Sequence, residues 1–321
     1  MRVRWFVAGF LALLVGAALW HRTRHAGQPQ PATLTLYGFS SLETVMQDAV
    51  LPAFQRRWQQ QTGATVQFIT TFAGSGQIID RILREVPVEV AILASEMDAD
   101  RLVSNGVVPG PVWKQLPHRG VVSASPIVIV VPRGNPKQIR DLGDLSRPQT
   151  RVLLPDPRTS GAGEWSILAV HGAAREPGGA QRTAQWLARR FQDAGALPAS
   201  AREAHRQFDQ LGADATLTYE AEASRRHGRL GDHEVLYPSH TVLSEHIVVR
   251  IDRNIELDKK ELVDALIDFL WSPPAQGLLV EYGFRAAETR RDPHPAGTEI
   301  FTLADLGGSR RAKQIIDQVL K

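Results

Sequence analysis

Hydrophobic and polar positions along this 321-residue chain follow two different periods, which alternate from one segment to the next. Short runs rich in β-branched residues, such as 33–37 and 88–93, predict β-strands. Longer segments such as 41–61, with apolar residues three or four positions apart, predict amphipathic helices. Because strands and helices alternate, the pattern predicts an α/β fold with mostly parallel sheets.

The predicted elements divide into two α/β units. The first contains strands over 33–37, 65–70 and 88–93 and helices over 41–61 and 78–85. Ser40 and Glu43 have the spacing of a capping box at the start of the first helix. The second unit contains a strand over 152–154 and helices over 165–170 and 181–194, and further helices are predicted over 259–271, 276–282 and 304–320. Two long extended runs, 121–132 and 241–251, are suited to cross between the units.

The N-terminus has the pattern of an export signal. Arg2 and Arg4 precede an uninterrupted apolar run over 5–20, and a polar cluster follows over 21–25. Sixteen apolar residues are few for a helix that spans a membrane, but they suit the core of a secretory signal. We therefore expect residues 1–26 to be a signal peptide, or a membrane anchor if they are retained, and residues 27–32 to be a linker. Such a protein is periplasmic or otherwise extracytoplasmic.

Composition and charge exclude several classes of function. Four arginines and no acidic residue precede residue 26, and removing those charges from the net charge of +3 leaves −1 for the rest of the chain. A nearly neutral body lacks the basic surface of a nucleic-acid-binding protein. The absence of cysteine excludes disulfides, thiolate nucleophiles and cysteine-based metal sites. The ten histidines are scattered, and His233, His240 and His246 lack a metal-ligand spacing, so we expect neither a metal nor a cofactor.

Three strand-to-helix turns carry serine beside glycine or another small residue. They are Gly38, Ser40 and Ser41 after the first strand, Gly74 and Ser75 after the second, and Ser160, Gly161 and Ala162 before the helix at 165. Carboxyl ends of strands gather at one edge of a doubly wound sheet, where helix N-termini offer N–H groups and a favourable dipole to an anion. Any one of these serines can be an ordinary N-cap. Three in the same context indicate an oxyanion-binding site.

An enzyme is the competing interpretation of Ser160. The chain contains neither a G-x-S-x-G elbow nor a P-loop, and the nearest histidine, His171, lies along the following predicted helix. We therefore expect no catalytic residues and a protein that binds its ligand without transforming it.

Four stretches carry a family resemblance: FAGSGQ (72–77), VPRGNPKQIRDLGDL (131–145), PDPRTSGAGEW (155–165) and FLWSPPAQGLLVEYGFR (269–285). In these stretches the chain resembles the periplasmic sulfate/thiosulfate-binding proteins of ABC importers. The resemblance implies a two-lobed solute-binding fold of type II, with a hinge of crossing segments between two doubly wound domains. One lobe would comprise 33–120 and 243–287 and the other 121–242, with a C-terminal loop and helix over 288–321 packed on both.

The same resemblance implies which residues hold the ligand. In that family a dehydrated sulfate is held by backbone N–H groups, a serine hydroxyl and an indole N–H. The positions that match the family motifs are Ser75, Ser160, Gly161 and Ala162, with Ala201 as a further match.

Two positions depart from the family pattern. Gly38 follows Tyr37 where the family has an aspartate, and Tyr219 stands where the family has its tryptophan donor. The related molybdate-binding proteins resemble the chain at both places, with a serine-rich first loop like Ser41-Leu42 and a tyrosine donor. A tyrosine hydroxyl can accept a hydrogen bond as well as donate one.

The resemblance implies the substrate-binding component of an ABC transporter, a monomer that presents sulfate or thiosulfate to a permease in the inner membrane. A pocket of donors alone suits a fully deprotonated dianion, whereas hydrogen phosphate needs an acceptor for its proton. Glu43, Glu164 and Glu220 flank the motifs, and helix-face or surface positions are expected for each. The alternatives are a molybdate-, tungstate- or phosphate-binding protein of the same fold, and a membrane-anchored anion sensor not dedicated to transport.

Overall fold

The computed structural model describes residues 31–174, 181–192, 195, 197–223, 233–290 and 297–321. The predicted export signal, most of the predicted linker and the end of the helix predicted over 181–194 lie outside the described residues. Within the described ranges, no helix has both the length and the apolar character needed to cross a membrane.

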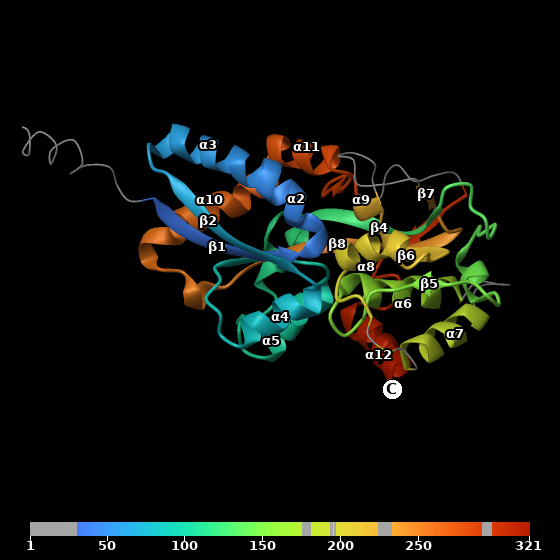
Figure 1. Ribbon diagram of the computed structural model, residues 1–321. Coiled ribbons are helices and arrows are strands. Elements are labelled where there is room, and N and C mark those ends of the chain that lie inside the picture. Colours follow the sequence, from blue (N-terminus) through green and yellow to red (C-terminus); the bar gives the residue numbers. More distant parts are fainter. Residues whose placement is uncertain (1–30, 175–180, 193–194, 196, 224–232, 291–296) are drawn as a thin grey trace, which may run out of the picture.

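The strands of the described residues form one mixed sheet that runs through two lobes (Figure 1). They are connected in the order β2-β1-β3-β8-β4-β6-β5, with β10 beside β8 and with β7 and β9 beside β4. Their bounds are β1 Ala32–Phe39, β2 Val66–Ala73, β3 Val90–Leu93, β4 Val121–Pro132, β5 Val152–Leu153, β6 Ala215–Tyr219, β7 His233–Leu236, β8 His240–Arg250, β9 Arg285–Ala286 and β10 Glu299–Phe301.

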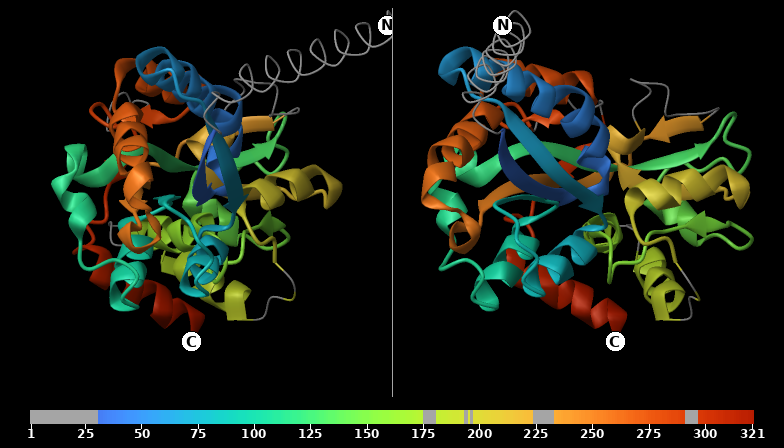
Figure 2. Two further views of the ribbon diagram at one scale, coloured as in Figure 1. Left: turned by 90° about the vertical axis from the view of Figure 1, so that its left-hand side faces the viewer. Right: turned by 60° about the vertical axis from the view of Figure 1, so that its left-hand side comes forward.

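Helices cover the sheet in both lobes (Figure 2). Their bounds are α2 Glu43–Val45, α3 Leu51–Thr62, α4 Ser75–Leu83, α5 Glu96–Ser104, α6 Gly161–Ala173, α7 Gln181–Gln192, α8 Ala201–Gln210, α9 Glu220–Ala223, α10 Lys260–Leu270, α11 Pro273–Glu281 and α12 Ser309–Leu320. α12 contacts α5 of the first lobe and α6 and α7 of the second, so the C-terminal helix lies against both lobes.

Lobe 1 is built around β1, which pairs in parallel with β2 on one side and with β3 on the other. Side chains alternate between the two faces of a strand. Leu34 and Leu36 pack in the same core as Phe54 of α3, whereas Tyr37 packs on the opposite face with Ile78 of α4. Figure 1 shows α3, α10 and α11 over one face of this sheet and α4 and α5 over the other. Both faces are buried, as parallel sheets require.

The predicted helix over 41–61 is confirmed as a helical segment, although its winding changes along its length. A 3₁₀ turn over Ser40–Leu42 leads into α2, a π-helical turn over Met46–Val50, and then α3. The π turn lies directly before Pro52, which has no N–H for the helical ladder. Gly63, in the left-handed region at φ 75°, ends the helix.

The capping box expected of Ser40 and Glu43 is wrong. No side chain caps the start of this segment. The Glu43 carboxylate instead pairs with the guanidinium of Arg202 on α8. The ion pair adds the attraction of two opposite charges to the hydrogen bond.

Lobe 2 contains the second half of the long strand β4, together with β5, β6 and β7. β5 pairs with β6 in parallel, and β6 pairs with β4 in the antiparallel sense. The buried face of β4 contributes Ile127 and Ile129 to the main core, which α6 joins through Trp165 and Leu168.

Two long strands, β4 and β8, connect the lobes. β4 pairs with β8 over Val121–Pro126 and then with β6 and β7 over its second half. β8 pairs with β10 near its start and with β3 near its end. The predicted crossing of 121–132 and 241–251 is therefore confirmed. Because both strands run antiparallel to their main neighbours, the sheet is mixed, and the expectation of mostly parallel sheets is wrong.

A buried histidine joins the two crossing strands. Nδ1 of His246 on β8 lies 2.8 Å from the hydroxyl oxygen of Ser123 on β4. The His246 ring is 0% exposed and packs against the rings of Phe39, Tyr219 and Phe284. Burial lowers the pKa of His246 to about 3, so the imidazole is neutral at physiological pH.

This neutral imidazole predicts a loss of stability in acid. A histidine in the unfolded chain binds a proton below pH about 6.5, whereas folded His246 stays neutral down to a pKa of about 3. The folded pKa is depressed, so the free energy of unfolding falls by about 1.4 kcal/mol per pH unit as the pH drops below about 6.5. Urea unfolding of the wild type and of His246→Asn between about pH 7 and pH 5 should show the steeper decline in the wild type. Equal slopes would contradict this assignment.

Candidate functional site

Three helix N-termini meet where the two lobes touch: α4 from lobe 1, and α6 and α8 from lobe 2. Gly74 is the N-cap of α4, and a Cβ atom built there would lie 2.3 Å from the carbonyl oxygens of both Thr159 and Ala199. Those two residues lie just before α6 and α8. The N–H of Gly76 donates to the Thr159 carbonyl at 3.0 Å. N-termini carry the positive ends of helix dipoles, so their convergence favours an anion.

Ser75, Gly161 and Tyr219 come together beside this contact. A Cβ atom at Gly161 would lie 3.3 Å from Cβ of Ser75, 3.0 Å from the Tyr219 hydroxyl and 2.7 Å from Cβ of Ala94. Only glycine permits this approach. The first turn of α6 is thereby placed against the ends of β3 and β6 and the start of α4.

Two hydroxyls in this region are buried without a hydrogen-bond partner in the described part of the chain. They are Oγ of Ser41 and the hydroxyl of Tyr219. Ser41 is 4% exposed and Tyr219 is 1% exposed. A buried polar group that lacks a partner costs about 1–3 kcal/mol, so proteins rarely leave one unless a ligand or water completes it. Burial, followed by the charges of Asp98, Glu164 and Glu222, raises the pKa of Tyr219 well above its usual value, and the nearby Ser244 side chain, which donates its own hydrogen to the carbonyl of Ala94 at 3.0 Å, opposes the rise. The phenol therefore keeps its proton and can donate it.

Several main-chain donors are also available. Across the described ranges, the N–H groups of Gly161 and Ala162 at the start of α6 and of Ala201 at the start of α8 have no hydrogen-bond acceptor. These are orphan donors of helix first turns, which need an external acceptor. The N–H groups of Gly76 and Gln77 on α4, in contrast, already donate to the Thr159 carbonyl.

Ser160 differs from the other serines that begin helices. Ser95 and Ser200 cap α5 and α8, because each hydroxyl oxygen accepts from the N–H three residues on. The hydroxyl of Ser160 makes no such bond to α6. Its turn is held by the main chain, since the N–H groups of Thr159 and Ser160 both donate to the carbonyl of Asp156. The ordinary N-cap interpretation therefore fits Ser200 and does not fit Ser160, whose hydroxyl is spared for another partner.

The remaining predicted residues lie around or behind the group formed by Ser75, Gly161 and Tyr219. Ser40 and Ser41 form the 3₁₀ turn after β1, which contacts α8 near Ala201. Gly38 lies inside β1, in register with Phe72 on one side and Ile92 on the other. A Cβ atom there would lie 2.8 Å from the ring of Phe72. The structure therefore gives Gly38 a packing role and does not bring it against Ser75, Gly161 and Tyr219.

Two acidic residues border the site. Asp98 on α5 is 1% exposed, and its carboxylate accepts hydrogen bonds from the hydroxyls of Ser75 and Ser95. Burial is the main cause that raises the pKa of Asp98. Burial and the neighbouring charge of Asp98 raise the pKa of Glu164, on the first turn of α6, to about 8.

Three glutamates were expected at helix faces or on the surface, and each has a different environment. Glu43 pairs with Arg202, whose Nε also lies 3.9 Å from the carboxylate of the buried Glu222. Glu220 accepts from Arg285 at 2.9 Å and from the hydroxyl of Tyr237. Glu164 is the exception, because its carboxyl lies near Asp98 rather than beside a paired cation.

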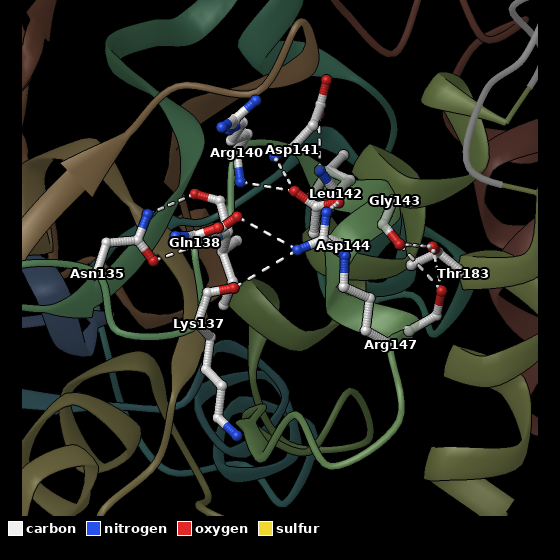
Figure 3. Close-up of polar contacts among 12 residues, drawn as sticks. Asn135, Lys137, Gln138, Arg140, Asp141, Leu142, Gly143, Asp144, Arg147 and Thr183 are labelled. Atoms are coloured by element: carbon white, nitrogen blue, oxygen red, sulfur yellow. Dashed lines mark hydrogen bonds and ion pairs between the residues drawn. The ribbon is translucent and has the colours of Figure 1, made fainter.

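One motif of the resemblance builds a loop remote from this group (Figure 3). Asn135 brackets Ile139, accepting from its N–H at 2.9 Å and donating to its carbonyl at 2.6 Å. The Asp144 carboxylate accepts from the N–H of Arg140 at 2.7 Å and pairs with Arg147. The side chains of Asn135 and Asp144 thus satisfy backbone groups of the loop itself, and this stretch is a structural signature of lobe 2.

Sequence reasoning missed two contributors. The helix α5 was not predicted, so Asp98 was not considered, although Ser95 and Asp98 have the spacing of an N-cap followed by an acid in the first turn. The second is Trp165, whose indole N–H donates to the carbonyl of Ala94 at 3.1 Å. This bond connects α6 of lobe 2 to the end of β3 in lobe 1, and it depends on a tertiary contact that no local pattern reveals.

Comparison with known proteins agrees with this architecture. The family model of bacterial extracellular solute-binding proteins matches residues 34–285. The sulfate-binding protein of Escherichia coli is 31% identical over 273 residues, which cover 82% of this chain and 83% of that protein. The thiosulfate-binding protein of Pseudomonas aeruginosa is 30% identical over 233 residues, or 70% of each chain. The solved structure of the sulfate-binding protein SubI from Mycobacterium tuberculosis superimposes with a TM-score of 0.76 and 28% identity, covering 88% of this chain and 98% of that one.

The unpartnered hydroxyl of Tyr219 predicts an unusual response to mutation. Tyr219→Phe removes a buried group that has no partner, so the unfolding free energy of the ligand-free protein should stay within about 0.5 kcal/mol of wild type or rise. The matched change Tyr237→Phe removes a hydroxyl that donates to Glu220, and it should cost about 1–2 kcal/mol. Chemical denaturation of both variants measures the difference. A larger loss in Tyr219→Phe than in Tyr237→Phe would show that the Tyr219 hydroxyl is already satisfied without ligand.

Proposed function

Because the chain belongs to the family of bacterial extracellular solute-binding proteins, we propose that it captures a tetrahedral oxyanion, sulfate or thiosulfate, and delivers it to an ABC permease in the inner membrane. The curated relatives that support this proposal are named sulfate- and thiosulfate-binding proteins. The single observation that carries it is the junction of three helix N-termini beside hydroxyls that are buried and unpartnered.

In this proposal the anion is held by groups from both lobes. The hydroxyls of Ser160 and Tyr219 and the N–H groups of Gly161, Ala162 and Ala201 would donate from lobe 2. Ser75 would contribute from lobe 1, with Ser40, Ser41 and Gly74 at the border and Gly38 supporting the strand behind them. Main-chain N–H groups and donating hydroxyls suit a dianion that carries no proton, because every oxygen can then accept. Binding requires no bond to form or break, so we propose a binding protein without enzymatic activity.

We also propose how the chain is organised for this task. Lobe 1 would comprise 33–120 and 243–287 and lobe 2 would comprise 121–242, with 288–321 packed on both. Separation of the lobes about β4 and β8 would open the site, and their closure would trap the anion. An exported chain of this kind would work outside the cytoplasm, as a monomer in front of its permease.

A second ligand class is favoured by one observation. Tyr219 offers a hydroxyl where the sulfate-binding pattern has an indole N–H, and the resemblance to molybdate-binding proteins rests on that tyrosine. Molybdate and tungstate are therefore the alternative ligands of the same site.

Calorimetric titration of the soluble body with sulfate, thiosulfate, molybdate, tungstate and phosphate tests the proposal. Sulfate or thiosulfate should bind with a Kd of about 1 µM or tighter, a free energy of about 8 kcal/mol. Phosphate should bind at least about tenfold more weakly, because N–H groups cannot accept its proton and the Asp98 carboxylate at the border already accepts from Ser75 and Ser95. Preference for molybdate would reassign the ligand within the same site. Tight phosphate binding with no response to sulfate would overturn this argument.

Gly74 provides a test of closure. A methyl group at Gly74 would collide with the carbonyl oxygens of Thr159 and Ala199 at 2.3 Å, and the lobes would have to stay apart to avoid it. Gly74→Ala should therefore weaken oxyanion binding at least about tenfold, about 1.4 kcal/mol, with little change in the stability of the ligand-free protein. The matched control is Gly277→Ala on α11, where a Cβ atom meets nothing within 4 Å. Unchanged affinity in Gly74→Ala would show that this contact is not needed in the bound state.

A further inference from the structure

Two acidic residues, Asp98 of lobe 1 and Glu164 of lobe 2, lie on either side of the lobe boundary next to the proposed site. The first turns of α5 and α6 are brought together at Ala94, whose carbonyl accepts from the indole N–H of Trp165 at 3.1 Å. Ala94 also meets Gly161, where a Cβ atom would lie 2.7 Å from its own. Asp98 lies one helical turn beyond Ala94, and Glu164 lies one turn beyond Gly161. The charge of Asp98 acts on Glu164, and both carboxyl groups act on the Tyr219 hydroxyl.

No cation is paired directly with either acid in the described part of the chain. Arg101 of α5 attracts both carboxylates, but it lies 3.3 Å from Asp80 of α4 and forms an ion pair there. Lys313 of α12 also attracts Glu164, and it is paired with Asp317 on the same helix, which repels Glu164. A buried carboxylate and a half-buried one that repel each other and have no cations of their own favour a state in which one of them is protonated.

The state of this pair decides what Ser75 can do. A serine hydroxyl has one hydrogen to donate, and in the structure that hydrogen is directed to the Asp98 carboxylate. When the proton of the pair resides on Asp98, that acid can donate to Ser75, and the serine hydrogen becomes available to an anion. The proton also removes a negative charge from beside the anion.

We propose that the Asp98–Glu164 pair takes up one proton when the lobes close on the oxyanion, so that capture of the ligand is linked to pH. The inference rests on the proposed function, and it adds to that function a device that regulates affinity. Asp98 belongs to lobe 1 and Glu164 to lobe 2. Opening the lobes would separate the acids and expose them to water, and closing them would bring the two together.

The direction of the pH effect on affinity follows from the pKa values of the two acids in the open and closed forms. In the open form the acids have ordinary pKa values of about 4, whereas in the closed form burial and mutual repulsion raise the pKa of Glu164 to about 8. The closed form therefore binds the extra proton between these values. Affinity should be fully present below the open-form pKa and should be lost, about tenfold per pH unit, as the pH rises toward about 8. Sulfate is fully deprotonated throughout this range, so its own ionisation does not contribute.

Calorimetric titration of the whole exported body with sodium sulfate between about pH 6 and pH 8 tests the inference. Repeating each titration in two buffers with different ionisation enthalpies counts the protons taken up. The wild type should take up close to one proton per sulfate at about pH 6.5, and its Kd should rise about tenfold per pH unit. The double variant Asp98→Asn/Glu164→Gln lacks both titrating groups and should show neither effect. The matched control Glu96→Gln, on the same helix but paired with Lys114, should behave as the wild type.

The outcomes separate the two proposals. Sulfate binding with a constant Kd and no proton uptake in the wild type would overturn the inference and leave the proposed function intact. Proton uptake that persists in the double variant would assign the proton to another group and overturn it as well. If none of the oxyanions binds at any pH, the proposed function is wrong and the inference falls with it. The wild-type measurement remains decisive even if the double variant fails to fold.

Discussion

The contact of main-chain atoms at the start of α4 constrains everything around it. Gly74 lies so close to the carbonyl oxygens of Thr159 and Ala199 that only a hydrogen atom fits between them. This approach sets how far the lobes can close, and it brings the first turns of α4, α6 and α8 to one place. The convergence of these N-termini and the burial of Tyr219 both depend on that distance of approach.

The crossing strands β4 and β8 support this contact between the two lobes. β4 and β8 pair with each other over Val121–Pro126 and then lead into different lobes. The bond between Ser123 and His246 joins them at their paired region, and the neutral imidazole fills the space between Phe39, Tyr219 and Phe284. A single aromatic cluster therefore connects the hinge strands to the residue that ends β6 at the site.

The sequence predicted the elements with strong periodic patterns and failed where tertiary contacts decide. The strands at β1 and β3 and the helices at α3, α7 and α10 follow their apolar periods. The last helix begins at Ser309 and not near 304, because Gly307 and Gly308 both have positive φ and delay its start. The helices α5 and α8 are short and polar, and their existence depends on caps from Ser95 and Ser200 and on packing against neighbours. The mixed pairing of the sheet arises from the path of β4 and β8, which no local pattern specifies.

In the candidate site, too, local patterns predicted some residues, whereas tertiary contacts determine the environment of the others. Small residues before helices predicted Ser75, Ser160, Gly161 and Ala162 as site residues, because the chemistry of anion binding uses local backbone groups, and the structure places Ser75 beside Gly161. Gly38 was predicted on the same pattern, but in the structure the absence of a side chain at Gly38 makes room for the ring of Phe72. The role of Glu164 could not be inferred, since its environment is made by α5 and α12, which are distant in sequence.

The bond from Trp165 to Ala94 has a consequence for observing the molecule at work. The indole is 1% exposed, and its N–H donates across the lobe boundary. The proposed opening of the lobes would break this bond and admit water to the ring, whereas Trp113 would stay enclosed within lobe 1. The emission wavelength of an indole responds to the polarity around it. Trp165 would therefore shift its emission on opening, and the chain would carry a spectroscopic signal of opening at the edge of its own site.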